Sequence, residues 1–177
     1  MSAYSKVDVF FWTTLESCGI AITAMSGRFF GAGDLQSLKK TVRTGLLFCV
    51  GISVVLTTLL LSFGRPLFGL FTDDPEVIAL GLQIQRLLVP SYVVFVFVII
   101  LGGALRGMGH SFVPMLITFV GICLCRVLWI YTVVPLRPEL MTTITSYPIT
   151  WALTSVAFIV YYRKKLRDEQ RLRPILP

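Results

Sequence analysis

Five long runs of apolar residues constrain this chain more than any other feature. They cover approximately residues 7–30, 44–63, 80–105, 112–134 and 141–162. A helix needs about 20 predominantly apolar residues to cross the hydrocarbon core of a bilayer. Glycine or proline inside such a run is tolerated when neighbouring helices satisfy the freed backbone groups. The sequence therefore predicts an all-α, polytopic transmembrane bundle with five spans.

The composition agrees with a membrane protein. Of the 177 residues, 55% are hydrophobic and 14% are charged, and the mean hydropathy is +0.82. An ordinary soluble domain of this length is less apolar. The run 141–162 is the weakest, because threonine, serine and proline dilute it. Buried helices of a soluble protein would explain one such run but not five in succession.

The distribution of lysine and arginine predicts the orientation, because cytoplasmic loops carry an excess of these residues. Eleven cations lie on one side of the five runs and four on the other. The eleven are Arg28, Lys39, Lys40, Arg43, Arg106, Arg163, Lys164, Lys165, Arg167, Arg171 and Arg173, and the four are Lys6, Arg65, Arg86 and Arg137. We therefore predict a multi-pass protein of the cytoplasmic membrane whose carboxy terminus is cytoplasmic.

The two ends of the chain lead to further expectations. The predicted orientation places the amino terminus outside the cell, but the sequence lacks the basic region and the cleavage site of a signal peptide. We therefore expect this sequence to be a piece of a longer chain. Residues 163–177 form a basic cytoplasmic tail. Such a tail could bind nucleic acid, but beside a span it more simply contacts anionic lipid headgroups. We expect the lipid bilayer, and no nucleic acid, as its partner.

The stretch 27–40, GRFFGAGDLQSLKK, invites comparison with a phosphate-binding loop. It follows a predicted helix instead of a strand, and no glycine directly precedes its lysines, so it does not fit that motif. We expect Gly31 and Gly33 to end the first helix, with Gly33 in the left-handed conformation. Asp34 would then cap a short helix whose lysines meet the headgroups. The stretch is predicted to be a cytoplasmic elbow.

A second cytoplasmic elbow is predicted at Arg106, Gly107 and Gly109. His110, the single histidine, follows it and is interpreted as a solvated loop residue. On the outer side, residues 74–76 (Asp-Pro-Glu) have the pattern of a helix start, with an aspartate cap, a proline at the first position and an acid near the positive end of the dipole.

Two charged residues lie deep inside predicted spans, where each is costly unless it is paired or faces water. Glu16 and Arg126 both lie roughly 12–14 Å from the outer ends of their spans, at 1.5 Å per residue. They could meet as a structural ion pair. Alternatively, Glu16 faces a water-filled cavity and binds a cation or a proton, while Arg126 tunes its pKa.

No other chemistry is indicated. The four cysteines, Cys18, Cys49, Cys123 and Cys125, lie inside the runs and lack zinc-site spacing, so we interpret them as small apolar residues. A membrane enzyme is disfavoured, because the sequence contains no His-Glu-x-x-His, no paired aspartate motif and no nucleophile elbow. We expect no metal and no cofactor.

Several motifs resemble the carboxy-terminal half of a multidrug and toxic compound extrusion (MATE) transporter. FFWTTLESCGIAITAMSGRFFGAGDLQSLKK is similar to the family's eighth helix, and GLFTDDPEVI to its Phe-Thr-x-Asp-Pro-Glu-Val loop. GGALRGMGHSFVPMLITFVGICLCRVLW resembles the elbow between the tenth and eleventh helices, and SYPITWALTSVAFIVYYRKK the last helix. The four motifs occur in the family's order and extend over nearly the whole sequence.

The resemblance implies one lobe of a two-lobe, inverted-V antiporter that exports organic, mostly cationic compounds in exchange for Na⁺ or H⁺. Residues 1–6 would end the seventh helix, and the five runs would be the eighth to twelfth. The amino-terminal lobe would be a missing partner. Glu16 is the candidate coupling residue and Arg126 its candidate partner. Trp12 and Tyr92 could line the cavity, since a cation over an aromatic ring gains on the order of 2 kcal/mol when desolvated.

The chain departs from the family's pattern in two places. Arg28 and Phe29 stand where the family has Gln-Asn, and the third run contains none of the acids that several branches carry there. The mode of coupling therefore stays open. A lipid-linked flippase of the same broad superfamily is the closest rival, and several cations in the cavity would favour it. A non-transporting membrane protein that associates through glycine faces such as Gly102 and Gly103 is a further alternative.

Overall fold

The structure is a computed structural model that describes residues 2–69, 74–135 and 140–172. The described residues form helices and turns, as predicted for an all-α protein. The elements are α1 (Ser2–Gly31), α2 (Leu35–Ser62), α3 (Gly64–Gly69), α4 (Pro75–Gly107), α5 (Phe112–Thr118), the π-helix η1 (Phe119–Leu124), α6 (Cys125–Thr132) and α7 (Leu140–Leu172).

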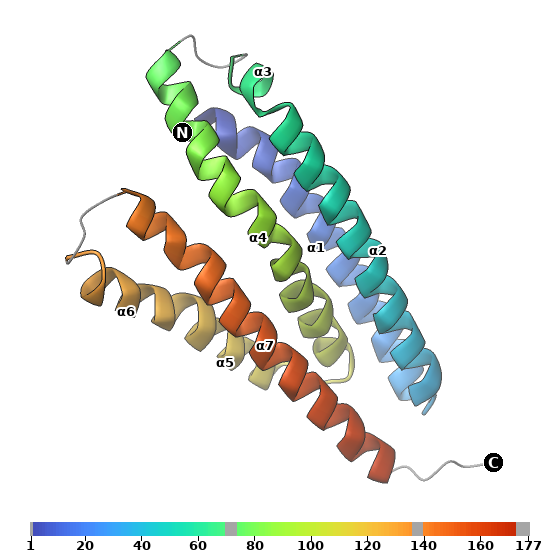
Figure 1. The fold of residues 1–177 in the computed structure, drawn as a ribbon. Coiled ribbons are helices and arrows are strands. Elements are labelled where there is room, and N and C mark those ends of the chain that lie inside the picture. Colours follow the sequence, from blue (N-terminus) through green and yellow to red (C-terminus); the bar gives the residue numbers. More distant parts are fainter. Residues whose placement is uncertain (1, 70–73, 136–139, 173–177) are drawn as a thin grey trace.

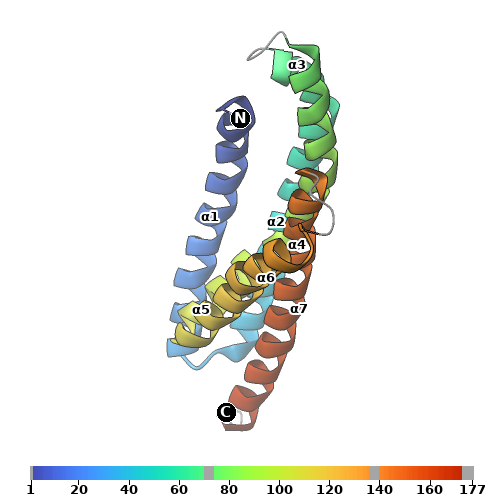
Figure 2. The ribbon, with the colours of Figure 1, turned by 90° about the vertical axis from the view of Figure 1, so that its left-hand side faces the viewer.

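Helix α4 is the centre of the bundle. It contacts α1 and α2 on one side and α7 on the other, and α5, η1 and α6 pack as a continuous rod against α7. Figure 1 shows this order, with α2 and α7 on opposite sides of α4, and Figure 2 shows the rod crossing α7 obliquely. The central position of α4 explains why its residues are buried more often than those of α2 or α6.

Four of the described helical segments are long and apolar enough to cross a membrane: Leu35–Ser62, Pro75–Gly107, Phe112–Thr132 and Met141–Arg171. They cover the second to fifth predicted runs to within two residues. The first run lies in α1, which is not among these four segments, so its crossing of the membrane stays a prediction. Residues 2–6 continue into α1 instead of ending a separate helix, which corrects that expectation.

The first elbow has the predicted geometry. Helix α1 ends at Gly31, Gly33 has a φ of 76°, and the Asp34 carboxylate accepts a hydrogen bond of 2.9 Å from the Ser37 amide. Bonds from Ser37 hold the pKa of Asp34 below its ordinary value of 3.8. The charged cap therefore contributes stability above that pH and loses it on acidification. The short helix after Asp34 is not separate, because α2 continues unbroken to Ser62.

The second elbow is held by backbone hydrogen bonds. Gly109 has a φ of 83°, and the His110 amide donates to the Leu105 carbonyl at 3.0 Å. This six-residue closure is the Schellman arrangement that ends many helices. Arg106 is exposed at the end of α4. Gly109 supplies the left-handed residue that this arrangement requires, in the elbow that the sequence predicted.

Small residues let α1 and α4 approach closely. A Cβ atom on Gly103 would lie 2.8 Å from the Gly19 carbonyl oxygen, and one on Gly107 would overlap the Thr23 carbonyl and lie 2.9 Å from the Gly27 amide nitrogen. We call these five residues the glycine seam. It has the small-xxx-small spacing of tightly packed membrane helices. Gly103 therefore packs against α1, and Gly102 packs against Phe158 of α7. These two glycines do not form an open face to which a separate partner could bind.

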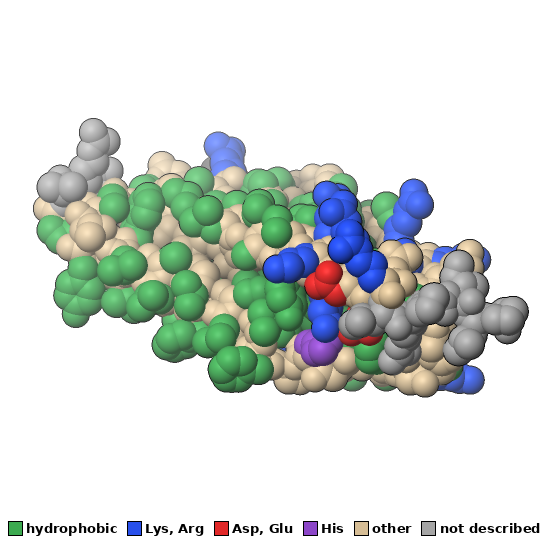
Figure 3. Space-filling model, turned by 90° about the horizontal axis from the view of Figure 1, so that it is seen from below, with side chains coloured by type: hydrophobic (Ala, Val, Ile, Leu, Met, Phe, Trp, Pro, Cys, Tyr) green, Lys and Arg blue, Asp and Glu red, His purple; other side chains and the backbone are tan. Residues whose placement is uncertain are grey.

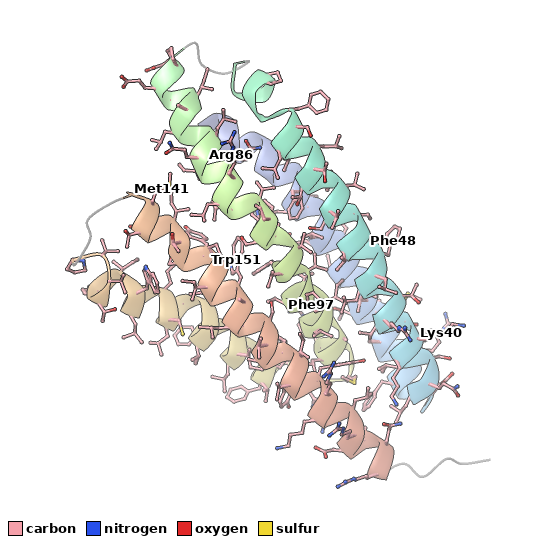
Figure 4. The ribbon with its side chains drawn as sticks, in the orientation of Figure 1. Lys40, Phe48, Arg86, Phe97, Met141 and Trp151 are labelled. Atoms are coloured by element: carbon pink, nitrogen blue, oxygen red, sulfur yellow. The ribbon has the colours of Figure 1, made fainter. Side chains whose placement is uncertain are left out.

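Most of the described cations gather at one end of the bundle. Figure 3 views the bundle from below and shows lysine and arginine side chains grouped around an acid and the histidine toward one end, with hydrophobic side chains over much of the remaining surface. In Figure 4, Lys40 lies at the lower end and Arg86 near the upper one. This arrangement follows the charge asymmetry on which the predicted orientation rests. Arg137 and Arg173 lie outside the described residues.

Candidate functional site

Glu16 lies on the exposed side of α1, one helical turn from Trp12. Residues four apart on a helix share a face, so Glu16 and Trp12 lie on the same face of α1. In the described part of the chain, no ion pair or hydrogen bond engages the Glu16 carboxylate. An open carboxylate can take up a proton or bind a cation. The coupling role of Glu16 stays a prediction.

Arg126 does not pair with Glu16. Its guanidinium carbon lies 3.7 Å from the centre of the Tyr147 ring, which belongs to α7. Its Nε atom is buried and has no hydrogen-bond partner among the described residues. The structural ion pair, one of the two alternatives for these residues, is therefore not formed among the described residues. The reason is the packing of α6 on α7, since α1 packs mainly against α2 and α4.

An aromatic cluster connects the two charged residues through three helices. The Trp12 ring lies 5.0 Å from Phe95 and 6.0 Å from Trp151, and the Trp151 ring lies 5.8 Å from Tyr147. Trp151 occupies the side of α7 that faces α4 (Figure 4). These separations are those at which aromatic rings attract one another. The row Trp12–Trp151–Tyr147 thus runs from the neighbour of Glu16 to the ring beneath Arg126.

Tyr92 belongs to the same cluster but is enclosed by it. Its ring lies 4.6 Å from Phe11 and 5.6 Å from Trp12, and the residue is 2% exposed. Trp12 is half-buried. Of the two predicted cavity aromatics, only Trp12 presents a surface in the described fold. Sequence reasoning missed Phe95, Tyr147 and Trp151, because only α-helix packing brings them together.

Residues before and after Arg126 in the sequence contact α7 and so fix the position of this part of the rod. The Trp129 indole donates a hydrogen bond of 3.0 Å to the Thr142 carbonyl, and Gly121 packs directly on the Thr154 side chain. Gly121 belongs to η1, which adopts the π-helical form that in other proteins occurs often at functional sites. A π-helix turns less per residue, so it changes the direction in which the following side chains point. Arg126 comes directly after it.

We expect Tyr147→Leu to lower the stability of the protein by about 1–2 kcal/mol, because a desolvated cation loses its aromatic partner. Tyr147→Phe keeps the ring face and is the matched control, for which we expect a change of less than about 0.5 kcal/mol. Equilibrium unfolding in detergent measures both. Equal losses in the two variants would show that the hydroxyl group, and not the ring beneath Arg126, supplies the stabilisation.

His110 is a loop residue, as predicted, and 31% of its side chain is exposed, but its Nε2 atom is buried. Its Nε2 atom lies 3.8 Å from the Glu169 carboxylate, which also lies 3.2 Å from the Lys165 ammonium group. Glu169 is 8% exposed. The end of α7 therefore lies against the elbow between α4 and α5. A contact between residues so far apart in sequence leaves no local signal.

Comparison with known proteins identifies the family. A family model described as MatE matches residues 1–132. The probable multidrug resistance protein NorM of Thermotoga maritima is 32% identical over 111 residues, which are 60% of this chain and 23% of that protein. The multidrug and toxin extrusion protein 2 of Oryctolagus cuniculus is 39% identical over 97 residues, 52% of this chain and 16% of that protein. The chain thus spans about a quarter or less of these relatives.

Solved structures show the same fold. An outward-facing MATE family transporter of the MOP superfamily matches with a TM-score of 0.86 and 13% identity, over 96% of this chain and 38% of that one. An inward-facing structure of such a transporter matches with a TM-score of 0.83 at the same identity, over 96% of this chain and 39% of that one. Together with the match of the family model over residues 1–132, this likeness leads to one conclusion: the chain belongs to the MATE family of membrane transporters.

Proposed function

We propose that this chain forms one lobe of a MATE antiporter that exports organic cations in exchange for Na⁺ or H⁺ across the cytoplasmic membrane. The observation that carries the proposal is the open carboxylate of Glu16 beside Trp12 in a lobe of this family. A carboxylate can hold the coupling ion, and a neighbouring indole ring can attract an organic cation. In this proposal, the organic cation leaves the cell as the coupling ion enters it.

The proposal includes a second lobe. The chain covers 38–39% of the matching transporter structures cited above, and the surfaces of α2 and α6 expose large apolar residues. We propose that an amino-terminal lobe completes the cavity and that the lipid bilayer covers the rest. The carboxy-terminal end of α7 would face the cytoplasm, where its cations follow the positive-inside rule.

The test is efflux of the cationic dye ethidium from bacteria that lack their own drug exporters. Cells that produce the chain together with an amino-terminal MATE lobe should lose dye faster than cells that produce either part alone. Collapse of the Na⁺ or the H⁺ gradient should stop the efflux and identify the coupling ion. Dye retention equal to that of empty cells, with both parts present in the membrane, would contradict the proposal.

A second candidate is transport of an anionic amphiphile, such as a lipid-linked compound. Arg126 favours it, because this permanent cation lies inside a span and its Nε atom has no described partner. One solved structure that matches with a TM-score of 0.86 and 13% identity is a MOP superfamily transporter from Pyrococcus furiosus, in which a binding pocket of reverse polarity suggests a different function. Efflux of an anionic dye, but not of ethidium, would support this alternative.

A further inference from the structure

Helix α7 extends well beyond the last predicted span residue, Tyr162. We call Arg163–Leu172 the α7 extension; it lies near the end at which the described cations gather (Figures 1 and 3). One side of it is fixed by Glu169, which is 8% exposed and contacts both His110 and Lys165. Because this inner side lies against the elbow after α4, residues on the opposite side of the extension face away from the bundle.

The opposite side of the extension is basic and hollowed. The residues that line this hollow are three or four positions apart in the sequence, which is the spacing of residues on a single helix face. Four of the six lining residues are cations and one is an acid. We call this set the basic face; it consists of Val160, Arg163, Lys164, Arg167, Asp168 and Arg171.

An apolar track leads into the basic face from the membrane side. Leu153, Val156 and Val160 are 57%, 59% and 61% exposed and follow one another at the same helical spacing. Val160 belongs to both the track and the hollow. The surface of α7 therefore changes from apolar to cationic along one line, at the depth where hydrocarbon gives way to headgroups.

We propose that this surface binds an anionic phospholipid of the cytoplasmic leaflet. The acyl chain lies along Leu153, Val156 and Val160, and the phosphate is held by Arg163 and Arg167. Guanidinium groups suit this role, because their fork of N–H donors matches two phosphate oxygens. A soluble phosphate compound would use the cations but would gain nothing from the apolar track. The charge complementarity and the track together favour a lipid.

Binding of phosphatidylglycerol to the purified protein tests the proposal, measured by native mass spectrometry or by the lipid-induced rise in Tm. We expect Arg163→Gln with Arg167→Gln to weaken binding roughly thirtyfold, since each cation near an anionic surface contributes about 1 kcal/mol. Lys39→Gln with Lys40→Gln is the matched control. It removes two cations from the same end of the bundle, on α2, and should change binding less than about threefold.

A variant of the apolar track separates a lipid from a soluble phosphate. We expect Val156→Asn to weaken phosphatidylglycerol binding, because the acyl chain loses an apolar contact. Inorganic phosphate should not compete with the lipid. Equal weakening by the arginine and lysine pairs, equal binding of phosphatidylcholine, or effective competition by inorganic phosphate would overturn the proposal.

Discussion

Replacement of Glu16 by glutamine is expected to reduce ethidium efflux to the background of cells without the protein. The amide keeps the size of the side chain but can neither take up a proton nor balance a cation at neutral pH. Without that charge, downhill entry of the coupling ion cannot drive export. Because the side chain is exposed, the substitution should leave the amount of folded protein in the membrane unchanged. Efflux corrected for membrane level measures the effect.

Glu76→Gln is the control for this prediction. It is the same chemical change at an exposed residue in the first turn of α4, outside the aromatic cluster, and we expect efflux to stay within about twofold of the wild type. Normal efflux by Glu16→Gln would exclude a coupling role. Loss of efflux in both variants would trace the effect to the overall charge of the protein.

The double variant Glu16→Gln with Arg126→Gln distinguishes the structural interpretation of the two charges. Since Arg126 lies on the Tyr147 ring and not against Glu16, we expect the two effects on stability to add. Additive effects are normal for residues that share no contact, to within about 0.5 kcal/mol. Restored stability in the double variant would instead indicate an ion pair in another conformation of the protein.

The second large effect is expected at the glycine seam. Gly107→Ala adds a Cβ atom where the Thr23 carbonyl and the Gly27 amide already lie. Both belong to the backbone of α1, so no side chain can turn away and the helices must separate. We expect a loss of about 3 kcal/mol in the free energy of unfolding, at the upper end of the usual cost of overpacking. Unfolding in detergent measures the loss.

Gly51→Ala is the matched control, because Gly51 lies inside α2 with nothing within 4 Å of its added Cβ atom. Alanine is the better helix former by about 1 kcal/mol, so this variant should be as stable as the wild type or more stable. If Gly107→Ala were equally harmless, the close approach of α1 and α4 would not be needed for the fold. A loss in both variants would indicate that glycine is required for helix flexibility instead.

Much of the fold could be predicted from local patterns. The apolar runs locate the long helices, because a span must be apolar over a fixed length. Gly33 and Gly109 end helices because each needs a positive φ, and Asp74 begins one because its side chain caps a free amide. The predicted boundaries were less accurate at two helix ends. The second run begins at residue 44 and the fifth ends at residue 162, but α2 begins at Leu35 and α7 continues to Leu172.

The candidate site was predicted only in part. Glu16 stands out in the sequence because a carboxylate inside an apolar run is costly. Its distance from Arg126 could not be predicted, since equal depth in two spans does not make the spans neighbours. Tyr147, Trp151 and Phe95 carry no special signal, because aromatic residues are common in apolar helices. Gly107 was assigned to an elbow, and only the crossing of α1 and α4 showed its second role.

The sequence by itself determined that this protein is a helical membrane protein with one cationic end, because hydrocarbon length and positive charge act on each segment separately. It also identified the family, since the helix-ending motifs recur in order. The tertiary structure alone decided which charged and aromatic side chains meet. Arg126 contacts Tyr147 and Glu169 contacts His110, because such contacts depend on which helices pack together and at what rotation, and neither quantity is encoded in any one segment.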